Sequence, residues 1–415
     1  MDLRDRVLLS VRGAVRGRLA ARASAGALLV GALAACGGPA GAVEGAASGW
    51  SAAAELPAPP ADAPVRGVAV AADAAGGVHV LYLVDRPAES REPRLFHAAR
   101  TDGAAPAALP LDDGRARIAS PRLTVDGAGR VHAAWIAGED PAEPRRLTHV
   151  VHRVLDAGRW SPAARVHREA SEHGIQAPFL ALRTDGRGRP SLLVARPDAG
   201  FSALTLDRGR WEAREDTAAA GGYAEWNAAG GDHADFVYVA SELVPGERTA
   251  VNDVWYRPAA PEGWGEPIRV HGAPTYSLEP QLATDGGGTR HVVWREGDSP
   301  GRTDRLFHAS AAPGEGWAPP RAFVPASAGA AVFAPRLAVD GRGVVHLAFL
   351  GVPESGEPRI YLARMERSAW HPLERFVPDP GPAGGPVSLA VDAAGAVHAV
   401  WRAADGRFRH AVYRP

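Results

Sequence analysis

The stretch AVDGRGVVHLAFL at residues 338–350 returns, with small changes, along most of the chain. Close copies are LTVDGAGRVHAAWI at 123–136 and LAVDAAGAVHAVWR at 389–402. In each copy a short apolar run is followed by Asp-x-x-Gly and then by a second apolar run. Asp at the first position and Gly at the fourth favour a type I β-turn, because the carboxylate accepts backbone N–H groups and Gly permits the exit conformation. Each copy is therefore predicted to be a β-hairpin.

Seven positions match the first residue of this turn: Asp73, Asp126, Asp185, Asn227, Asp285, Asp340 and Asp392. A glycine stands three residues after each one, and a histidine stands six residues after all but the third, which has Ser191. The copies recur about every 53 residues, a spacing typical of propeller and solenoid repeats. Because the acidic residue repeats in nearly every copy, we interpret it as a turn former and not as a metal ligand or a catalytic group.

Two further phrases follow each hairpin. RLFHAAR at 94–100 and RLFHASA at 305–311 indicate a third strand, and RWSPAARV at 159–166 and AWHPLERFV at 369–377 indicate a fourth. Four short strands make one propeller blade. The last copy ends before its fourth strand, and the missing phrase, GWSAAAEL, stands at 49–56. The predicted fold class is all-β: a seven-bladed β-propeller over residues 49–415, closed by the N-terminal strand, which completes the last blade.

The repeat resembles the P-x-L-x-x-D-x-x-G-x-x-H-x-x-W units of divergent members of the sialidase-like, BNR-type propeller superfamily. The resemblance extends over about residues 49–415 and implies the propeller fold. Two motifs of sialidases proper are altered. TDGGGTRHVVW at 284–294 has the residue types of an Asp-box at a different spacing, and VRGVAV at 65–70 stands where the family carries Arg-x-Pro. These departures argue against sialidase chemistry.

The N-terminus has the features of an export signal. An Arg-rich segment precedes the apolar stretch ASAGALLVGALAA at 23–35, which is too short to span a bilayer. The stretch ends in LAAC, and Cys36 is the only cysteine. This arrangement resembles a bacterial lipoprotein signal, which implies a signal peptide at 1–35, lipidation of Cys36 and a flexible tether at 36–48. Gly37 favours the outer membrane, and membrane contact is expected through the lipid anchor only.

Composition excludes some function classes. The net charge is −1, so no overall field attracts nucleic acid. All 46 basic residues are Arg, which excludes lysine-based catalysis and a P-loop lysine. No nucleotide, haem or metal motif occurs, so we expect no cofactor and no metal. Most of the 15 histidines fall on predicted second and third strands. We interpret them as packing residues, one per blade and well apart, that bond the backbone or the turn Asp.

Unrepeated residues are the candidates for function. Ligand sites of propellers usually form around the central channel, on the face that carries the connections between blades. The candidates on this face are Arg122, Tyr223, Glu225, Glu279, Gln281, Arg295, Arg336 and Arg402. Arginine binds carboxylates bidentately, which suits a carboxylated sugar. A Tyr or carboxylate nucleophile with a second acid is a glycosidase arrangement.

Three functions are compatible with these residues. The first, which we favour, is a non-catalytic, envelope-anchored module whose propeller face binds a glycan or protein ligand. The second is a glycan-active enzyme, either a sialidase-like glycoside hydrolase or a polysaccharide lyase, acting on carboxylated sugars. The third is an envelope assembly scaffold. Arg, Tyr and carboxylate converging at a deep channel mouth would favour the enzyme, whereas a shallow aromatic face around Trp226, Tyr276 and Phe333 would favour binding.

Overall fold

The structure is a computed structural model of the chain, and it describes residues 49–415 with short gaps. The gaps are 60–63, 87–89, 91, 102–106, 115–116, 139–148, 169–179, 186, 196–199, 219–222, 231–234, 244–249, 261–262, 273–275, 300–301, 324–330, 354–355, 367–368, 372–373 and 376–380. The predicted signal peptide, Cys36 and the tether lie outside the described residues, as does His233.

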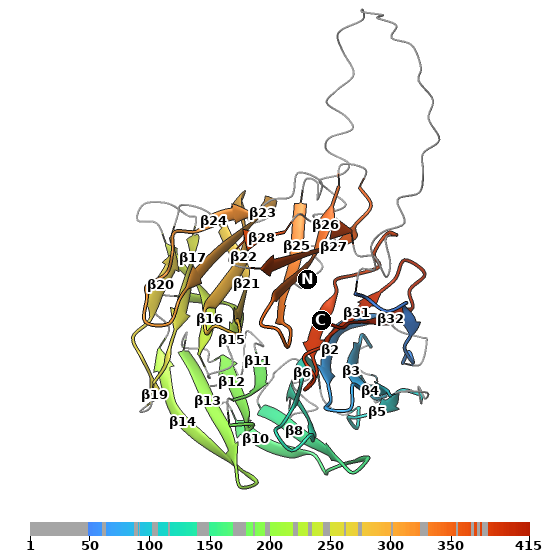
Figure 1. Cartoon of the computed structure of the whole chain (residues 1–415). Coiled ribbons are helices and arrows are strands. Elements are labelled where there is room, and N and C mark those ends of the chain that lie inside the picture. The colour runs from blue at the N-terminus through green and yellow to red at the C-terminus, as the bar shows by residue number, and fades with distance from the viewer. Residues whose placement is uncertain are drawn as a thin grey trace, which may run out of the picture. The chain divides into compact units, whose positions relative to one another are not determined.

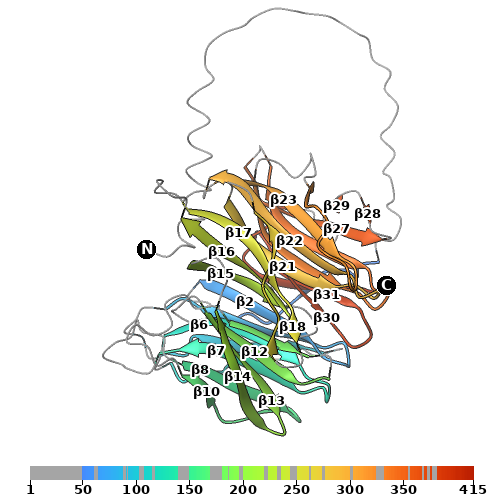
Figure 2. The ribbon, with the colours of Figure 1, turned by 90° about the vertical axis from the view of Figure 1, so that its left-hand side faces the viewer.

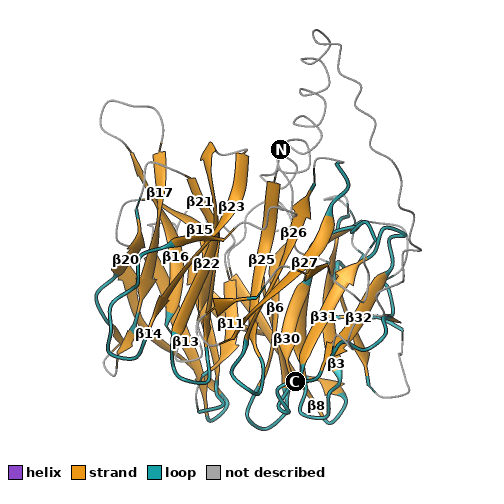
Figure 3. Cartoon of the chain, turned by 45° about the horizontal axis from the view of Figure 1, so that its top comes forward, coloured by secondary structure: helices purple, strands orange, loops and turns teal. Residues whose placement is uncertain are grey.

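The described residues are all-β: they form strands and turns and contain no helix (Figure 3). In this part of the chain there is accordingly no helix with the length and apolarity needed to cross a membrane. Three of the sheets have four antiparallel strands, two have five, and one sheet of eight strands comprises two further sets of antiparallel strands. We number these seven sets of strands as units 1–7 in chain order.

Units 1–3 each consist of strands that are consecutive in the chain. Unit 1 contains β2 (Val65–Ala72), β3 (Val78–Val84), β4 (Leu95–Arg100) and β5 (Leu109–Pro110). Unit 2 contains β6 (Ile118–Val125), β7 (Val131–Ala137), β8 (His149–Asp156), β9 (Arg159–Trp160) and β10 (Ala164–Arg168). Unit 3 contains β11 (Leu180–Thr184), β12 (Pro190–Ala195), β13 (Gly200–Asp207) and β14 (Arg210–Ala218).

Units 4 and 5 are joined by one parallel bridge, between Asn252 and Tyr276. Unit 4 contains β15 (Tyr223–Gly230), β16 (Phe236–Leu243), β17 (Ala250–Arg257) and β20 (Ile268–His271), with a small pair, β18 (Ala259–Ala260) and β19 (Gly263–Trp264), beside it in the chain. Unit 5 contains β21 (Tyr276–Thr284), β22 (Arg290–Ser299), β23 (Arg302–Ala311) and β24 (Arg321–Phe323). Figure 2 shows β17 beside β21.

Units 6 and 7 end the chain. Unit 6 contains β25 (Ala331–Val339), β26 (Val345–Val352), β27 (Arg359–Glu366), β28 (Ala369–Trp370) and β29 (Glu374–Arg375). Unit 7 contains β30 (Ser388–Val391), β31 (Val397–Arg402), β32 (Phe408–Tyr413) and, from the other end of the chain, β1 (Ala54–Glu55). Ala54 pairs with His410, and Trp50 forms a bridge with Tyr413.

The first strand of each unit contacts the first strand of the next. These contacts join β2 to β6, β6 to β11, β11 to β15, β15 to β21, β21 to β25, β25 to β30, and β30 to β2. In Figure 1 these strands lie toward the middle of residues 50–415, and the last strands of the units lie toward the periphery. Buried apolar side chains fill the spaces between neighbouring units; for example, Leu81 and Trp135 of units 1 and 2 belong to one cluster. Burial of this kind is the main stabilising contribution to a fold.

The hairpin turns have the predicted geometry in six units. In unit 1, the Asp73 carboxylate accepts the backbone N–H of Ala75 at 2.9 Å and of Gly77 at 2.8 Å. Gly76 has a φ of 80°, in the left-handed region that only glycine adopts without strain. The same two acceptor bonds recur at the turn carboxylates of units 2, 3, 5 and 6.

The prediction for unit 4 was wrong. Asn227 lies inside β15 and not in a turn, and Gly230 is the last residue of that strand, paired with Phe236. The connection between β15 and β16 therefore begins after Gly230, later in the chain than the turn that the sequence predicts. The Asn-x-x-Gly match misled because the four residues that form it lie in β15, whose pairing with β16 runs to Gly230.

Candidate functional site

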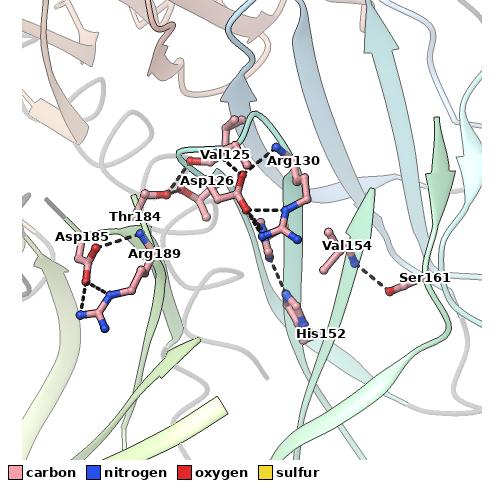
Figure 4. Close-up of polar contacts among 12 residues, drawn as sticks. Val125, Asp126, Arg130, His152, Val154, Ser161, Thr184, Asp185 and Arg189 are labelled. Carbon is pink, nitrogen blue, oxygen red and sulfur yellow. Dashed lines mark hydrogen bonds and ion pairs between the residues drawn. The ribbon is translucent and has the colours of Figure 1, made fainter. Parts of the chain in front are cut away.

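A chain of hydrogen bonds runs behind the turn in several units. In unit 2 the turn residue Asp126 contacts His132 Nε2 through Oδ2 at 3.0 Å, and His132 Nδ1 lies 3.0 Å from His152 Nε2 (Figure 4). Trp211, from β14 of unit 3, donates its indole N–H to His152 Nδ1 at 3.3 Å. We call this Asp–His–His–Trp arrangement the relay. Because its last member comes from the next unit, the relay ties neighbouring sheets together.

The indole fixes the direction of the relay. An indole N–H can only donate, so His152 Nδ1 must accept, and a neutral His152 then carries its proton on Nε2. That proton is donated to His132 Nδ1, which leaves the His132 Nε2 proton for the Asp126 carboxylate. Burial lowers the pKa of His152 to about 3, with a smaller contribution from the neighbouring His132. Both rings are buried, so the relay is neutral apart from its terminal carboxylate.

The same arrangement recurs in other units. In unit 1 it joins Asp73, His79 and His97, and Trp160 of unit 2 donates to His97 at 3.4 Å. Unit 5 has Asp285, His291 and His308, with Trp370 edge-on to His308, and unit 7 has Asp392, His398 and His410. Unit 6 keeps the contact of Asp340 with His346, and there Tyr413 packs on the His346 ring.

This arrangement partly corrects the interpretation of the histidines. The bond from each second-strand ring to the turn Asp is confirmed in units 1, 2, 5, 6 and 7. The expectation of one well-separated histidine per blade was wrong, because a third-strand histidine lies about 3 Å from the first in four of these units. The third-strand phrases do contain a recurring His. Predicting the histidine pairs also requires the register of the second and third strands, which makes the two histidines diagonal neighbours.

Units 3 and 4 replace the relay. In unit 3, Asp185 is bound by the Nε of Arg189 at 3.0 Å, and Ser191 stands in place of the first histidine. In unit 4, Asp235 accepts a hydrogen bond from the Tyr256 hydroxyl at 2.8 Å. Burial raises the pKa of Tyr256, and the negative charge of Asp235 raises it further. The repeated turn therefore does not require the relay behind it.

At the opposite end of the first strands, units 2, 5 and 6 share a strained bulge. Ser120, Glu279 and Ala334 have φ values of 50°, 53° and 49°, and each immediately precedes a proline. A non-glycine residue in this region costs about 1 kcal/mol or more, and the position before proline disfavours it further. Strain of this kind persists only where the surrounding structure imposes it, and it often marks a functional site.

Each bulge positions one of the predicted ligand-binding side chains. Arg122, Gln281 and Arg336 each follow the proline and donate a side-chain N–H to that proline's carbonyl, at 2.9, 2.8 and 2.7 Å. All three are half-buried and lie at corresponding positions of first strands that adjoin the middle of the molecule. The bulge thus fixes the direction in which each polar side chain leaves its strand.

Two other predicted residues form an ion pair beside these bulges. Arg295 Nε lies 3.1 Å from Glu279 Oε2, and the same oxygen accepts the backbone N–H of Ala334 at 2.7 Å. The Arg295 guanidinium lies over the Phe333 ring, 5.2 Å from its centroid. Glu279 therefore connects the strained bulges of units 5 and 6. Arg295 is 6% exposed, so solvent and salt screen its charge only weakly.

The next residue of β22 supplies a buried carboxylate that the sequence analysis missed. Because successive side chains of a strand point to opposite faces, Glu296 points away from unit 6, toward unit 4. It is 3% exposed, accepts the indole N–H of Trp294 at 3.0 Å and lies 3.1 Å from His271 Nε2. Ser277 donates a longer hydrogen bond to it at 3.4 Å. No repeat or motif marks Glu296, because its partners come from three strands.

The remaining candidates do not join this cluster in the described structure. Arg402 caps its own hairpin, donating from Nε to the Gly406 carbonyl at 3.2 Å. The backbones of Tyr223 and Glu225 lie in β15, whereas their side chains, like that of Trp226, lie outside what the structure describes. Most of the segment 168–178, which connects units 2 and 3, also lies outside the described residues.

No protein-family model matches the chain, and no curated protein matches it in sequence. Its structure is similar to solved structures with β-propeller folds. A polysaccharide lyase of family PL25, an ulvan lyase bound to -[GlcA(1-4)Rha3S]-, has a TM-score of 0.55 at 12% identity, covering 87% of this chain and 94% of the lyase.

Two further similarities are weaker. An α-L-arabinanase of Penicillium chrysogenum has a TM-score of 0.47 at 13% identity, covering 71% of this chain and 93% of that chain. The GH93 α-L-arabinofuranosidase of Fusarium graminearum has 0.46 at 12% identity, covering 72% and 94%. Because scores below 0.5 do not establish a shared fold, the fold comparison rests on the lyase.

Proposed function

We propose that residues 49–415 form a seven-bladed β-propeller of the sialidase-like type, closed by the N-terminal segment in the last blade. Two observations support closure. The first strands contact one another in cyclic order, with β30 returning to β2. The segment around Trp50 and β1 pairs with β32, which would otherwise expose a strand edge. We further propose that the chain is a lipoprotein of the bacterial outer membrane, anchored through Cys36.

The proposed activity is non-catalytic binding of an acidic glycan at the end of the propeller where the strained bulges lie. The observation that carries it is the repeated bulge, which holds Arg122 and Arg336 at corresponding positions of two blades. A guanidinium is a planar donor suited to carboxylate and sulfate groups. Strain at both positions is accounted for if the bulges fix these arginines for a ligand.

Two further observations support a glycan over a protein ligand or an assembly scaffold. The propeller with the TM-score of 0.55 binds a polymer that contains glucuronate, so the fold accommodates acidic glycans. Beside the arginines, Phe333 lies against Arg295, which gives the site an aromatic surface on which a sugar ring can stack. Two carboxylates described beside the bulges are engaged, Glu279 by Arg295 and Glu296 by Trp294, which suits a binding role.

Cleavage of the same kind of polymer is a second candidate, which the buried Glu296 and His271 favour. A carboxylate 3.1 Å from an imidazole can act as an acid–base pair if a substrate reaches it. Incubation with uronate-containing polysaccharides distinguishes the two functions. Binding without new reducing ends or unsaturated uronate products supports non-catalytic glycan binding. Product formation that Glu296→Gln abolishes supports glycan cleavage.

The binding test uses the purified full chain and two series of oligosaccharides, one containing uronate or sulfate and one neutral. Wild type is expected to bind the acidic series, and Arg336→Ala to lose about tenfold or more in affinity, because a charge-assisted contact contributes about 1.5–3 kcal/mol. Arg342→Ala is the matched control: Arg342 is exposed and lies at the other end of the same hairpin. Equal binding of neutral and acidic series by all three proteins would overturn the proposal.

A further inference from the structure

The three strained bulges share a backbone conformation but differ in their side chains. In unit 5 the strained residue is Glu279, and its ion-pair partner Arg295 lies on the second strand, beside the bulge. The residues at the corresponding two positions are Ser120 and Ile136 in unit 2, and Ala334 and Leu350 in unit 6. Neither of those sets can form an ion pair. The charged pair is therefore an unrepeated feature, which the bulge itself does not require.

Both members of this pair contact the bulge of unit 6. Glu279 Oε2, which lies 3.1 Å from Arg295 Nε, accepts the backbone N–H of Ala334 at 2.7 Å. Ala334 is the strained residue of the unit 6 bulge, with a φ of 49°. The Arg295 guanidinium lies over the ring of Phe333, the residue before Ala334. The side chain of one strained residue thus holds the backbone of the other.

This contact controls the direction of Arg336. A residue before proline favours an extended backbone, so Ala334 would relax toward that region without the hydrogen bond to Glu279. Such a change rotates the peptide of Pro335, whose carbonyl accepts the Arg336 side chain at 2.7 Å. Gln281 has the same contact with the proline that follows Glu279. The orientations of Gln281 and Arg336 are therefore linked through Glu279.

We propose that Glu279 is a positioning residue, which couples the ligand-binding side chains of units 5 and 6. Gln281 and Arg336 then act together, and Arg122 of unit 2 acts independently of them. The inference rests on the proposed binding of an acidic glycan at the bulges. Glu279 acts through the reach of its carboxylate and not through its charge, because a negative charge by itself repels an acidic ligand.

Two substitutions separate reach from charge. Glu279→Asp keeps the charge and shortens the side chain, and should weaken binding of the acidic oligosaccharides about fivefold. Glu279→Gln keeps an oxygen that reaches Ala334, and its affinity should stay within about twofold of wild type. Glu279→Gln should nevertheless lower the melting temperature, because it removes a counter-charge of the buried Arg295.

The matched control is Glu315→Asp, the same chemical change at an exposed residue of unit 5, in the turn between β23 and β24. Its affinity and melting temperature should equal those of wild type. A loss of affinity in Glu279→Gln without one in Glu279→Asp would show that the charge matters and the reach does not, and would overturn the proposal.

A double-mutant cycle tests the coupling. Glu279→Asp should cost less than about twofold in affinity when Arg336 is already alanine, and about fivefold when Arg122 is alanine. Equal losses in the two backgrounds would overturn the coupling and leave glycan binding intact. Failure of wild type to bind any acidic oligosaccharide would instead overturn the proposed function itself.

Hydrogen exchange tests the coupling without a ligand. Glu279→Asp in the full chain should speed exchange in the peptide that covers β25, residues 331–339, because the Ala334 N–H loses its acceptor. Glu279→Gln and Glu315→Asp should exchange this peptide at the wild-type rate. Unchanged exchange of residues 331–339 in Glu279→Asp would overturn the proposal, whether or not a glycan binds.

Discussion

Units 2 and 3 have the same turn and a different interior (Figure 4). Asp126 and Asp185 both accept two backbone N–H groups, and each binds the Nε of the arginine four residues later. Behind the turn, however, unit 2 places two histidines between its carboxylate and the tryptophan of the next unit, and unit 3 does not.

The comparison separates local from tertiary requirements. The turn needs only residues close in sequence, so Asp and Gly are retained in both units. The relay needs two strands and a side chain from the next unit, and losing it leaves buried polar atoms and a pocket. Repeated residues thus build the scaffold, and positions at which the repeat fails are where ligand chemistry can be accommodated.

Removing the segment that completes unit 7 should have the largest effect. Deletion of residues 49–56 unpairs β32 and removes Trp50, which packs against Tyr413 at 5.5 Å between ring centroids. Trp50 is half-buried, so its loss should cost less than the about 3–5 kcal/mol typical of a fully buried tryptophan, and the deletion also removes the buried Leu56. The urea midpoint of the truncated chain should fall accordingly. A midpoint equal to that of the full chain would show that the segment contributes nothing to closure.

Breaking the relay should cost less, and only in a unit that has one. His152→Ala leaves the Trp211 indole N–H and His132 Nδ1 without partners and opens a cavity, with an expected loss of about 3 kcal/mol in unfolding free energy. Ser191→Ala in unit 3 removes a hydroxyl from the pocket wall and should change stability by less than about 1 kcal/mol. Denaturant unfolding of both variants tests the comparison, which losses of equal size would contradict.

Acid should weaken the relays in a defined range. Burial lowers the pKa of His97, His152 and His308 to about 3, from an ordinary value of 6.5. These rings stay neutral in the folded chain and take up protons when it unfolds below about pH 6.5. The contribution of these histidines to the free energy of unfolding is therefore fully present above about pH 6.5 and declines as the pH falls from about 6.5 toward 3. Urea midpoints at about pH 7.5 and about pH 5 measure this; equal midpoints would show that the rings are not buried and neutral.

The sequence predicted the scaffold well because the turn is local. Asp-x-x-Gly located the hairpins of six units correctly, and the tryptophan phrase at residue 50 identified the segment that pairs with β32. In unit 4 the same motif failed at Asn227, because its four residues lie in β15, whose pairing with β16 runs to Gly230. A motif of four residues cannot report strand pairing, which depends on a second strand.

The site was harder to predict than the scaffold. Arg122, Gln281 and Arg336 were found because they occupy one position relative to each turn, and the structure gives all three the same local contact. Glu296 was missed, since its contact with His271 comes from packing between units. The pairing of histidines within a unit was missed because it depends on the register of two strands.

The central claim is that repeated residues hold the fold and unrepeated residues at the bulged end bind the ligand. His346 and Arg336, both in unit 6, test it in one comparison, with thermal melts and an acidic-oligosaccharide titration for each alanine variant. The account predicts that His346→Ala lowers the melting temperature and leaves affinity nearly unchanged. It predicts that Arg336→Ala keeps the melting temperature and loses about tenfold or more in affinity. Unfolding by Arg336→Ala together with loss of binding in a stable His346→Ala would contradict it.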